Sequence, residues 1–306
     1  MERSVGIPRD ATPVSPGEAY WRQRHAVAAH AGRIRALFEV VESSKELWPY
    51  QWAQLLAMTL EFRPDLVIEL GRGWGNSTCV FTEAMNQLGG DGRRVVSVCL
   101  SEGWETRTRA RVAGLVPPEW FTPLQARRSD ILAVDYAALA CDAKRCLVFW
   151  DAHGFDIAEC VLGEILPSIV DRPHLVLMHD LSDGRWAGPA ATHYGTRGLW
   201  KGNNWGGPRV RLGDIDSAVE QSVAIVDFMS RNGRRLGSAD ESIREVIGAD
   251  PARMAEMTRL LGPDLFDLQA HWFWFSLNDR AGTLTFPRFQ WAKAHETRLA
   301  ALAEVA

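Results

Sequence analysis

The chain has 306 residues, 46% of them hydrophobic and 24% charged, which is typical of a globular protein with room for one large domain. Its formal net charge of -4 argues against a nucleic-acid partner, because binding to a phosphate backbone needs a basic face. Five cysteines without a CxxC pair indicate free thiols in a reducing compartment. With no apolar signal core and no apolar run of the ~20 residues that a membrane helix needs, the sequence predicts a cytoplasmic protein without membrane contact.

The N-terminal part of the chain is predicted to be an arm followed by helices. Residues 1–16 contain three prolines and no hydrophobic periodicity, so we expect a loose arm there. Residues 17–46 show helical spacing of apolar residues, and a further helix is expected over 50–62. Pro64 ends that helix, because proline disfavours a helical conformation in the residue before it.

From residue 65 onward, short apolar runs alternate with helical segments. This alternation predicts right-handed crossovers and a mostly parallel sheet. Each apolar run reads as a strand buried on both of its faces. The expected strands are 65–70, 93–100, 123–130, 146–151 and 174–180, and the expected helices between them are 76–88, 102–113 and 156–170.

The C-terminal third departs from this rhythm. A stretch rich in glycine and aromatic residues, 184–213, lies directly after the last predicted strand. Helices are expected from residue 217 and over 240–261, and residues 271–286 are predicted to form a hairpin. We therefore expect an N-terminal arm and helical cap at 1–48, an α/β domain at 49–287 with an insertion at 184–235, and a C-terminal helical tail at 288–306.

A glycine turn joins the first strand of the predicted sheet to the next helix. In VIELGRGWGNST, Glu69 precedes Gly71, Gly73 and Gly75, and glycines at such a turn let a ligand approach the backbone. A dinucleotide site needs GxGxxG, but Asn76 stands where the third glycine would be. The spacing fits S-adenosylmethionine (SAM) better, with Glu69 bonding its cationic part. The alternative is a plain α/β turn that uses glycines for geometry alone.

Three stretches together resemble a known family. ELWPYQWAQLLAMTLEFRPDLVIELGRGWGNST, VFWDAHG and HLVLMHDLSD are similar to elements of the cephalosporin hydroxylase-like and sugar O-methyltransferase group of class I SAM-dependent methyltransferases. The resemblance covers roughly residues 45–182. It implies a Rossmann-like α/β fold with a seven-stranded sheet and a terminal antiparallel hairpin, and it implies SAM as cofactor. The residues expected to contact SAM are Glu69, Gly71, Gly73, Gly75, Ser77, Glu102 and Asp130.

The chain departs from this family where the second strand of the sheet ends. Class I enzymes usually carry an acidic residue there, which bonds the ribose hydroxyls of SAM. Here Cys99 and Leu100 occupy that point, and Glu102 is the nearest acidic substitute. Without a substitute, the resemblance implies weakened SAM binding.

Acidic and imidazole groups follow two neighbouring predicted strands. Asp151 ends one strand and His179 and Asp180 end the next, so they are expected at the carboxyl edge where open α/β sheets bind ligands. Asp151, His179 and Asp180 are predicted to hold a divalent cation such as Mg²⁺, Mn²⁺ or Zn²⁺. His153 is the predicted catalytic base, and Asp151 is the second predicted catalytic residue. The alternative for His179 is a hydrogen bond to a loop backbone.

The glycine-rich insertion is predicted to be a lid over a small hydroxylated acceptor, a sugar or a natural-product intermediate. Its aromatic residues would stack on the acceptor, and a static loop packed on the neighbouring helices is the alternative. The predicted function is a metal-assisted O-methyltransferase. A non-catalytic binding or scaffold relative, and an NAD(P)-dependent oxidoreductase, are the competing functions, and a homo-oligomer stays open. The predicted acceptor-binding residues are His193, Tyr194, Trp200 and Trp205.

Overall fold

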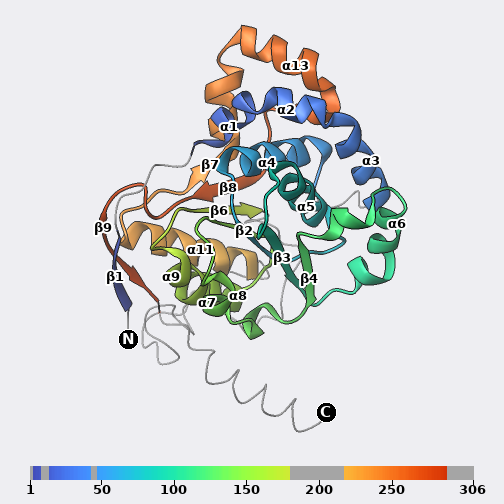
Figure 1. Ribbon diagram of the computed structural model, residues 1–306. Helices are drawn as coiled ribbons and strands as arrows, with labels where there is room; N and C mark the ends of the chain where they lie inside the picture. The colour runs from blue at the N-terminus through green and yellow to red at the C-terminus, as the bar shows by residue number, and fades with distance from the viewer. Residues whose placement is uncertain (1–2, 8–13, 43–46, 180–216, 288–306) are drawn as a thin grey trace.

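A computed structural model describes residues 3–7, 14–42, 47–179 and 217–287 of the chain. Its centre is a seven-stranded sheet in the order β4-β3-β2-β5-β6-β8-β7, in which β8 alone runs against the others (Figure 1). This sheet confirms the predicted Rossmann-like α/β fold class. Its strands are β2 (Leu66–Leu70), β3 (Arg94–Cys99), β4 (Leu124–Arg128), β5 (Cys146–Trp150), β6 (His174–His179), β7 (Gly237–Ser238) and β8 (Trp272–Phe275).

Two helical layers cover the two faces of the sheet, because successive side chains of each strand point to opposite faces. Val67 and Phe149 belong to the core under α4 (Pro49–Phe62) and α5 (Asn76–Leu88). Ile68 and Val148 belong to a second core on the opposite face. The helical elements on that second face are α7 (Tyr136–Ala140), α8 (Phe155–Cys160), η4 (Val161–Ile165), α9 (Leu166–Ile169) and α11 (Ser217–Arg231).

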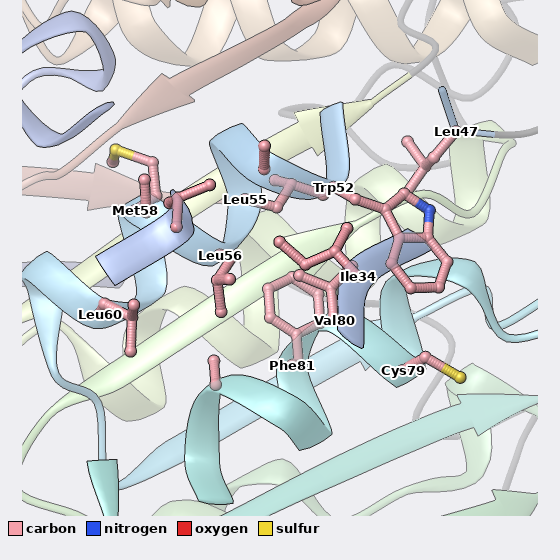
Figure 2. Close-up of a cluster of buried hydrophobic side chains, with 14 of the residues drawn as sticks. Ile34, Leu47, Trp52, Leu55, Leu56, Met58, Leu60, Cys79, Val80 and Phe81 are labelled. Carbon is pink, nitrogen blue, oxygen red and sulfur yellow. The ribbon is translucent and has the colours of Figure 1, made fainter. Parts of the chain in front are cut away.

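Further helices pack outside α4 and complete the first core. Figure 2 shows side chains of three helices meeting there, among them Ile34, Leu56 and Phe81. In Figure 1 the first helices of the chain and α13 (Pro251–Leu265) lie beyond α4, so α4 is enclosed by the sheet on one side and by helices on the other. The remaining helical elements are α1 (Pro16–Arg22), α2 (Arg24–Ala29), α3 (Ala31–Val41), η1 (Trp104–Thr108), α6 (Arg109–Ala113), η2 (Pro118–Phe121), η3 (Ile131–Ala133), α12 (Ala239–Ile243) and η6 (Arg244–Gly248).

The two ends of the described chain form a second, two-stranded sheet. Strand β1 (Arg3–Ile7) pairs antiparallel with β9 (Gly282–Phe286), with Val5 opposite Leu284. Residues 3–7 are therefore a strand, and the prediction of a loose arm was wrong for them. The predicted hairpin over 271–286 was also wrong in its pairing: β8 joins the large sheet between β6 and β7, while β9 pairs with β1.

Three of the predicted helices contain π-helical turns. Residues 104–108, 161–165 and 244–248 are π-helical, and the second of these turns stands directly before the turn that contains Pro167. Pro167 has no backbone N–H, so it cannot make the helical hydrogen bond to the preceding turn, and the helix widens there. No helix among the described residues is long and apolar enough to cross a membrane.

Candidate functional site

The carboxyl ends of three neighbouring strands bring Gly71, Asp151 and His179 side by side. The backbone N–H of Asp151 donates to the carbonyl of Leu70 (2.9 Å), and that of Gly71 donates to Val98 (3.0 Å). Strand β5 lies between β2 and β6 with both pairings parallel, so the residues that follow β2 and β5 fall at the same edge as the end of β6. The expectation that Asp151 and His179 share this edge is confirmed.

The glycine turn has the backbone that only glycine adopts easily. Gly71, Gly73 and Gly75 have φ values of 92°, 51° and 99°. A Cβ atom on Gly71 would lie 2.6 Å from the carbonyl oxygen of Asp151, and one on Gly75 would lie 2.4 Å from Cε3 of Trp104. Packing within the protein therefore accounts for glycine at positions 71 and 75, whether or not a ligand binds there.

Helix α5 starts directly after this turn without a side-chain cap. Gly75 is its N-cap, and no side-chain hydrogen bond to the cap is made. The side chains of its first residues bond elsewhere: Ser77 and Thr78 donate to Glu69, and Asn76 accepts from the indole of Trp52. The first N–H groups of a helix have no partner within the helix and attract negative charge. This buried helix start is therefore suited to an anionic group.

Glu69 lies beneath the turn rather than in front of it. Its carboxylate is fully buried and accepts hydrogen bonds from the hydroxyls of Ser77 (2.5 Å) and Thr78 (2.6 Å). Burial raises the pKa of Glu69, while these hydrogen bonds and the charge of Arg72 act in the opposite direction. Glu69 and Ser77, both predicted to contact the cofactor, thus bond to each other and support the backbone of the turn.

Arg72 is a buried cation within the turn. Its guanidinium donates to the backbone carbonyl and the hydroxyl of Ser97 (2.9 and 3.2 Å) and pairs with Glu105 at 2.8 Å. The Arg72 side chain is fully buried, whereas about a third of Glu105 is exposed. Arg72 therefore ties the turn to β3 and to the helical segment that carries Trp104.

A chain of hydrogen bonds joins Asp151, His179 and Gln51. His179 Nδ1 lies 3.1 Å from Asp151 Oδ1, and His179 Nε2 lies 3.1 Å from Gln51 Nε2. The side chain of His179 is almost fully buried, and that of Asp151 is one-fifth exposed. Both ring nitrogens of His179 have protein partners, which leaves neither for a cation. Among the described residues, the partners of the two ring nitrogens are these side chains and not a loop backbone.

His153 stands in the loop after β5. Its Nδ1 atom is buried and makes no hydrogen bond to any residue that the structure describes. The loop around it is held at both sides: the carbonyl of Ala152 accepts from the indole of Trp150 (2.9 Å), and the N–H of Gly154 donates to Gln221 (3.2 Å). A buried imidazole nitrogen at the carboxyl edge is suited to exchange a proton with a ligand.

The predicted ribose-side residues are engaged elsewhere. Cys99 ends β3 and Leu100 after it is exposed, so no carboxylate stands at that strand end. Glu102 forms a surface ion pair with Arg128. Asp130 caps the short helix η3, accepting from the N–H of Leu132 at 2.9 Å. Each of the two acidic residues thus has a structural partner.

Several predicted site residues lie outside the described residues. Asp180 of the predicted metal site is one of them, so the structure describes Asp151 and His179 without it. Within the described ranges, no group of three or more His, Cys, Asp or Glu side chains is placed to hold a metal ion. The four predicted acceptor residues also lie outside the described ranges: His193, Tyr194, Trp200 and Trp205.

Sequence reasoning missed three residues that shape this edge. Gln51 and Arg72 are polar or charged side chains that are almost fully buried, and Trp104 covers Gly75. For Gln51 a signal existed: α4 is apolar almost throughout, yet Gln51 and Gln54 stand three residues apart and so share one face of the helix. Buried amides on one face predict specific hydrogen-bond partners.

Comparison with known proteins gave similarity to solved structures alone: no family model and no curated protein matches the chain. One solved structure is an O-methyltransferase from Bacillus cereus in complex with SAH, at 16% identity, TM-score 0.36, 52% of this chain and 68% of that one. Another is a putative O-methyltransferase from Klebsiella pneumoniae, at 14% identity and a TM-score of 0.39, with 74% of this chain and 79% of that one covered. A third is an SAH-bound methyltransferase from Podospora anserina, at 15% identity and a TM-score of 0.43, with 68% of this chain and 87% of that one covered. Because these values are low, we base the proposed function on the chain's own residues.

Proposed function

We propose that this protein is a SAM-dependent O-methyltransferase. The observation that carries the proposal is the buried start of α5, whose N-cap is a glycine, directly after the Gly71–Gly75 turn and beside Asp151 at the carboxyl edge of the sheet. A helix start of this kind suits a ligand carboxylate, and SAM has a carboxylate at its amino-acid end. The GxGxG spacing, which lacks the third glycine of a dinucleotide site, favours SAM over NAD(P).

The residues at the turn fit the amino-acid end of SAM better than its ribose. The N–H groups of the first turn of α5 would hold the carboxylate, and Glu69 beneath them would balance the ammonium group through the backbone and hydroxyls around it. The end of β3 provides Cys99 in place of a carboxylate. We therefore expect weaker binding of the ribose than in enzymes with an acidic residue there. When bound, SAM supplies a methyl group on a positively charged sulfur.

The protein's own groups would prepare the acceptor. A hydroxyl group of the acceptor forms the new bond to the methyl carbon, and the bond from that carbon to sulfur breaks, with its electron pair staying on sulfur. The hydroxyl proton would pass to the imidazole of His153, whose Nδ1 has no partner in the described part of the chain. The carboxylate of Asp151 would accept a hydrogen bond from a second, neighbouring hydroxyl of the acceptor and so orient the acceptor.

The divalent cation expected from the sequence has less support than SAM. Both ring nitrogens of His179 are hydrogen-bonded, which would leave Asp151 and Asp180 as protein ligands. A cation on those two carboxylates would lower the pKa of a bound hydroxyl, as metal ions do for water. Metal analysis of the purified protein and turnover in EDTA decide whether a cation takes part.

The acceptor class rests on the resemblance and on the insertion. We propose a hydroxylated small molecule, a sugar or a natural-product intermediate, bound under the glycine-rich stretch 184–213. Aromatic side chains there would stack on a ring of the acceptor. Limited proteolysis with and without SAH and acceptor tests the lid, because a lid is protected from cleavage only when the ligands are bound. The residues assigned to the acceptor are His193, Tyr194, Trp200 and Trp205.

Transfer of an isotope-labelled methyl group from SAM to a panel of hydroxylated sugars and phenols tests the function. We expect O-methylated product with the wild type and at least a ~100-fold lower rate with His153→Gln, as for loss of a general base. His25→Gln is the control: this histidine is exposed and distant in sequence from His153, so the variant should keep the wild-type rate. No transfer to any acceptor, or equal rates for wild type and His153→Gln, would overturn the proposal.

A further inference from the structure

We propose that Gln51 is a positioning residue: it fixes the tautomer of His179 and, through His179, the orientation of the Asp151 carboxylate. The inference rests on the proposed function in one respect, namely that Asp151 meets a hydroxyl of the acceptor. The three side chains come from α4, β6 and the loop after β5, and only the geometry of the fold brings them together.

The orientation of the Gln51 amide is fixed by two backbone groups. Its Oε1 accepts from the N–H of Trp48 at 2.7 Å, and a backbone N–H can only donate. Its Nε2 donates to the carbonyl of Ala270 at 2.6 Å, and a carbonyl can only accept. Exchanging the amide oxygen and nitrogen would break both bonds, so the atom 3.1 Å from His179 is the NH₂ group.

This fixes the protonation of His179. Because the Gln51 NH₂ group is a donor, His179 Nε2 must accept and therefore carries no proton. In a neutral imidazole the proton is then on Nδ1, which lies 3.1 Å from Asp151 Oδ1 and donates to it. A doubly protonated ring would place two donors against each other at Nε2. The ring of Phe149, whose centroid lies 6.5 Å from that of His179, packs beside the imidazole.

The consequence for Asp151 is a carboxylate held by one oxygen. Among the residues that the structure describes, His179 is the hydrogen-bond partner of this carboxylate, and it bonds Oδ1. Oδ2 is then the oxygen left to accept from a hydroxyl of the acceptor next to the reacting one, on a side chain that is one-fifth exposed. The other tautomer of His179 would present a lone pair to Oδ1 and repel it. Gln51 thus acts on Asp151 without touching it.

Gln54 provides a matched control within the same helix. It is as buried as Gln51 and also bonds to the backbone that precedes β8: its Nε2 donates to Gln269 at 2.8 Å, and its Oε1 accepts from the indole of Trp272. No contact between Gln54 and His179 occurs in the described part of the chain. A substitution at Gln54 therefore removes comparable structural bonds and leaves the ring of His179 alone.

The test is ¹⁵N NMR of the imidazole nitrogens in the full-length protein at neutral pH, with the His179 signals assigned by their loss in His179→Asn. We expect an unprotonated Nε2 and a protonated Nδ1 in the wild type and in Gln54→Glu. In Gln51→Glu a carboxylate faces Nε2 in place of the NH₂ group, so Nε2 should become protonated, and the ring between two carboxylates should then carry a proton on each nitrogen. Gln51→Met loses the same hydrogen bonds but places no acceptor at Nε2. A protonated Nε2 in Gln51→Glu alone is therefore due to the carboxylate and not to the loss of packing.

Each result decides one part of the inference. A protonated Nε2 in the wild type, or an unchanged ring in folded Gln51→Glu, would overturn the tautomer assignment. If Nε2 becomes protonated, kcat on the best acceptor of the panel should fall roughly 10-fold or more in Gln51→Glu, because a charged ring makes Asp151 a weaker acceptor of further hydrogen bonds, and it should stay near the wild-type value in Gln54→Glu. A protonated Nε2 with unchanged kcat would overturn the positioning role. Absence of methyl transfer by the wild type would contradict the proposed function and leave the NMR result standing.

Discussion

Gly71 and Asp151 are packed so closely that a side chain on Gly71 would overlap the backbone of Asp151. An ideal Cβ atom on Gly71 would lie 2.6 Å from the carbonyl oxygen and 2.8 Å from the carbonyl carbon of Asp151. These atoms belong to the loop between β5 and α8, which is tied to β2 by the hydrogen bond from Asp151 N–H to Leu70. The glycine turn and the proposed acceptor site are therefore packed directly against each other.

The first prediction follows from this contact. Gly71→Ala should lower the free energy of unfolding by more than about 2 kcal/mol, because it adds strain at a positive φ and forces the Asp151 loop away. Gly89→Ala is the control: its φ is also positive, at 58°, but its Cβ would meet no atom within 4 Å. Urea denaturation measures both. Equal losses in the two variants would contradict the close packing of Gly71 on Asp151.

A second prediction concerns the buried cation in the turn. Glu105→Gln removes the charged partner of Arg72, whose guanidinium is fully buried. We expect a loss of about 1–3 kcal/mol in the free energy of unfolding, since an uncompensated buried charge is costly but Glu105 is partly exposed. Glu42→Gln, in the exposed pairs with Arg107 and Arg111, should change stability little. A stability unchanged by Glu105→Gln would mean that Ser97 and the backbone alone suffice to hold the guanidinium.

The third prediction is a pH dependence of stability at Glu159. Burial raises the pKa of Glu159 from 4.5 to about 7. The folded state therefore favours the protonated form of Glu159. The contribution of this group to the free energy of unfolding is fully present below the unfolded pKa and is lost as the pH rises from about 4.5 to about 7. The total change is on the order of 3 kcal/mol. Between about pH 5 and about pH 8, wild-type stability should fall more steeply than that of Glu159→Gln.

Denaturation curves at both ends of that pH range measure the effect. Glu119→Gln, at an exposed glutamate, is the control and should follow the wild type. If wild type and Glu159→Gln lose stability in parallel, Glu159 does not titrate in this range in the folded protein.

Sequence patterns predicted the centre of the large sheet well because the central strands β2, β5 and β6 are buried on both faces. Residues 66–70 and 146–150 are continuous apolar runs apart from Glu69, and a run of this kind identifies a central strand whatever its partners are. Strand β1 was missed because residues 3–7 are short, lie at an edge and pair with residues 282–286. Local periodicity contains no information about a partner so distant in the sequence.

The site was predicted only as far as strand ends reveal it. Asp151 and His179 come directly at strand ends, so a parallel sheet must place them together. Gln51 comes from a helix, and its contact with His179 depends on how α4 lies on the sheet, which no spacing in the sequence specifies. Glu69 shows a different kind of difference: its position in the motif is as expected, but its carboxylate turns under the helix toward Ser77 and Thr78.

Calorimetric titration of the purified protein with SAM and with SAH tests the central claim most directly. We predict binding by the wild type and a loss of at least ~10-fold in affinity for Gly73→Val, because a side chain at this turn blocks the approach of a ligand to the backbone. Gly92→Val, at another glycine with positive φ whose Cβ would meet no atom within 4 Å, should bind as the wild type does. No binding by the wild type, or equal affinity in Gly73→Val, would contradict a SAM site at the Gly71–Gly75 turn.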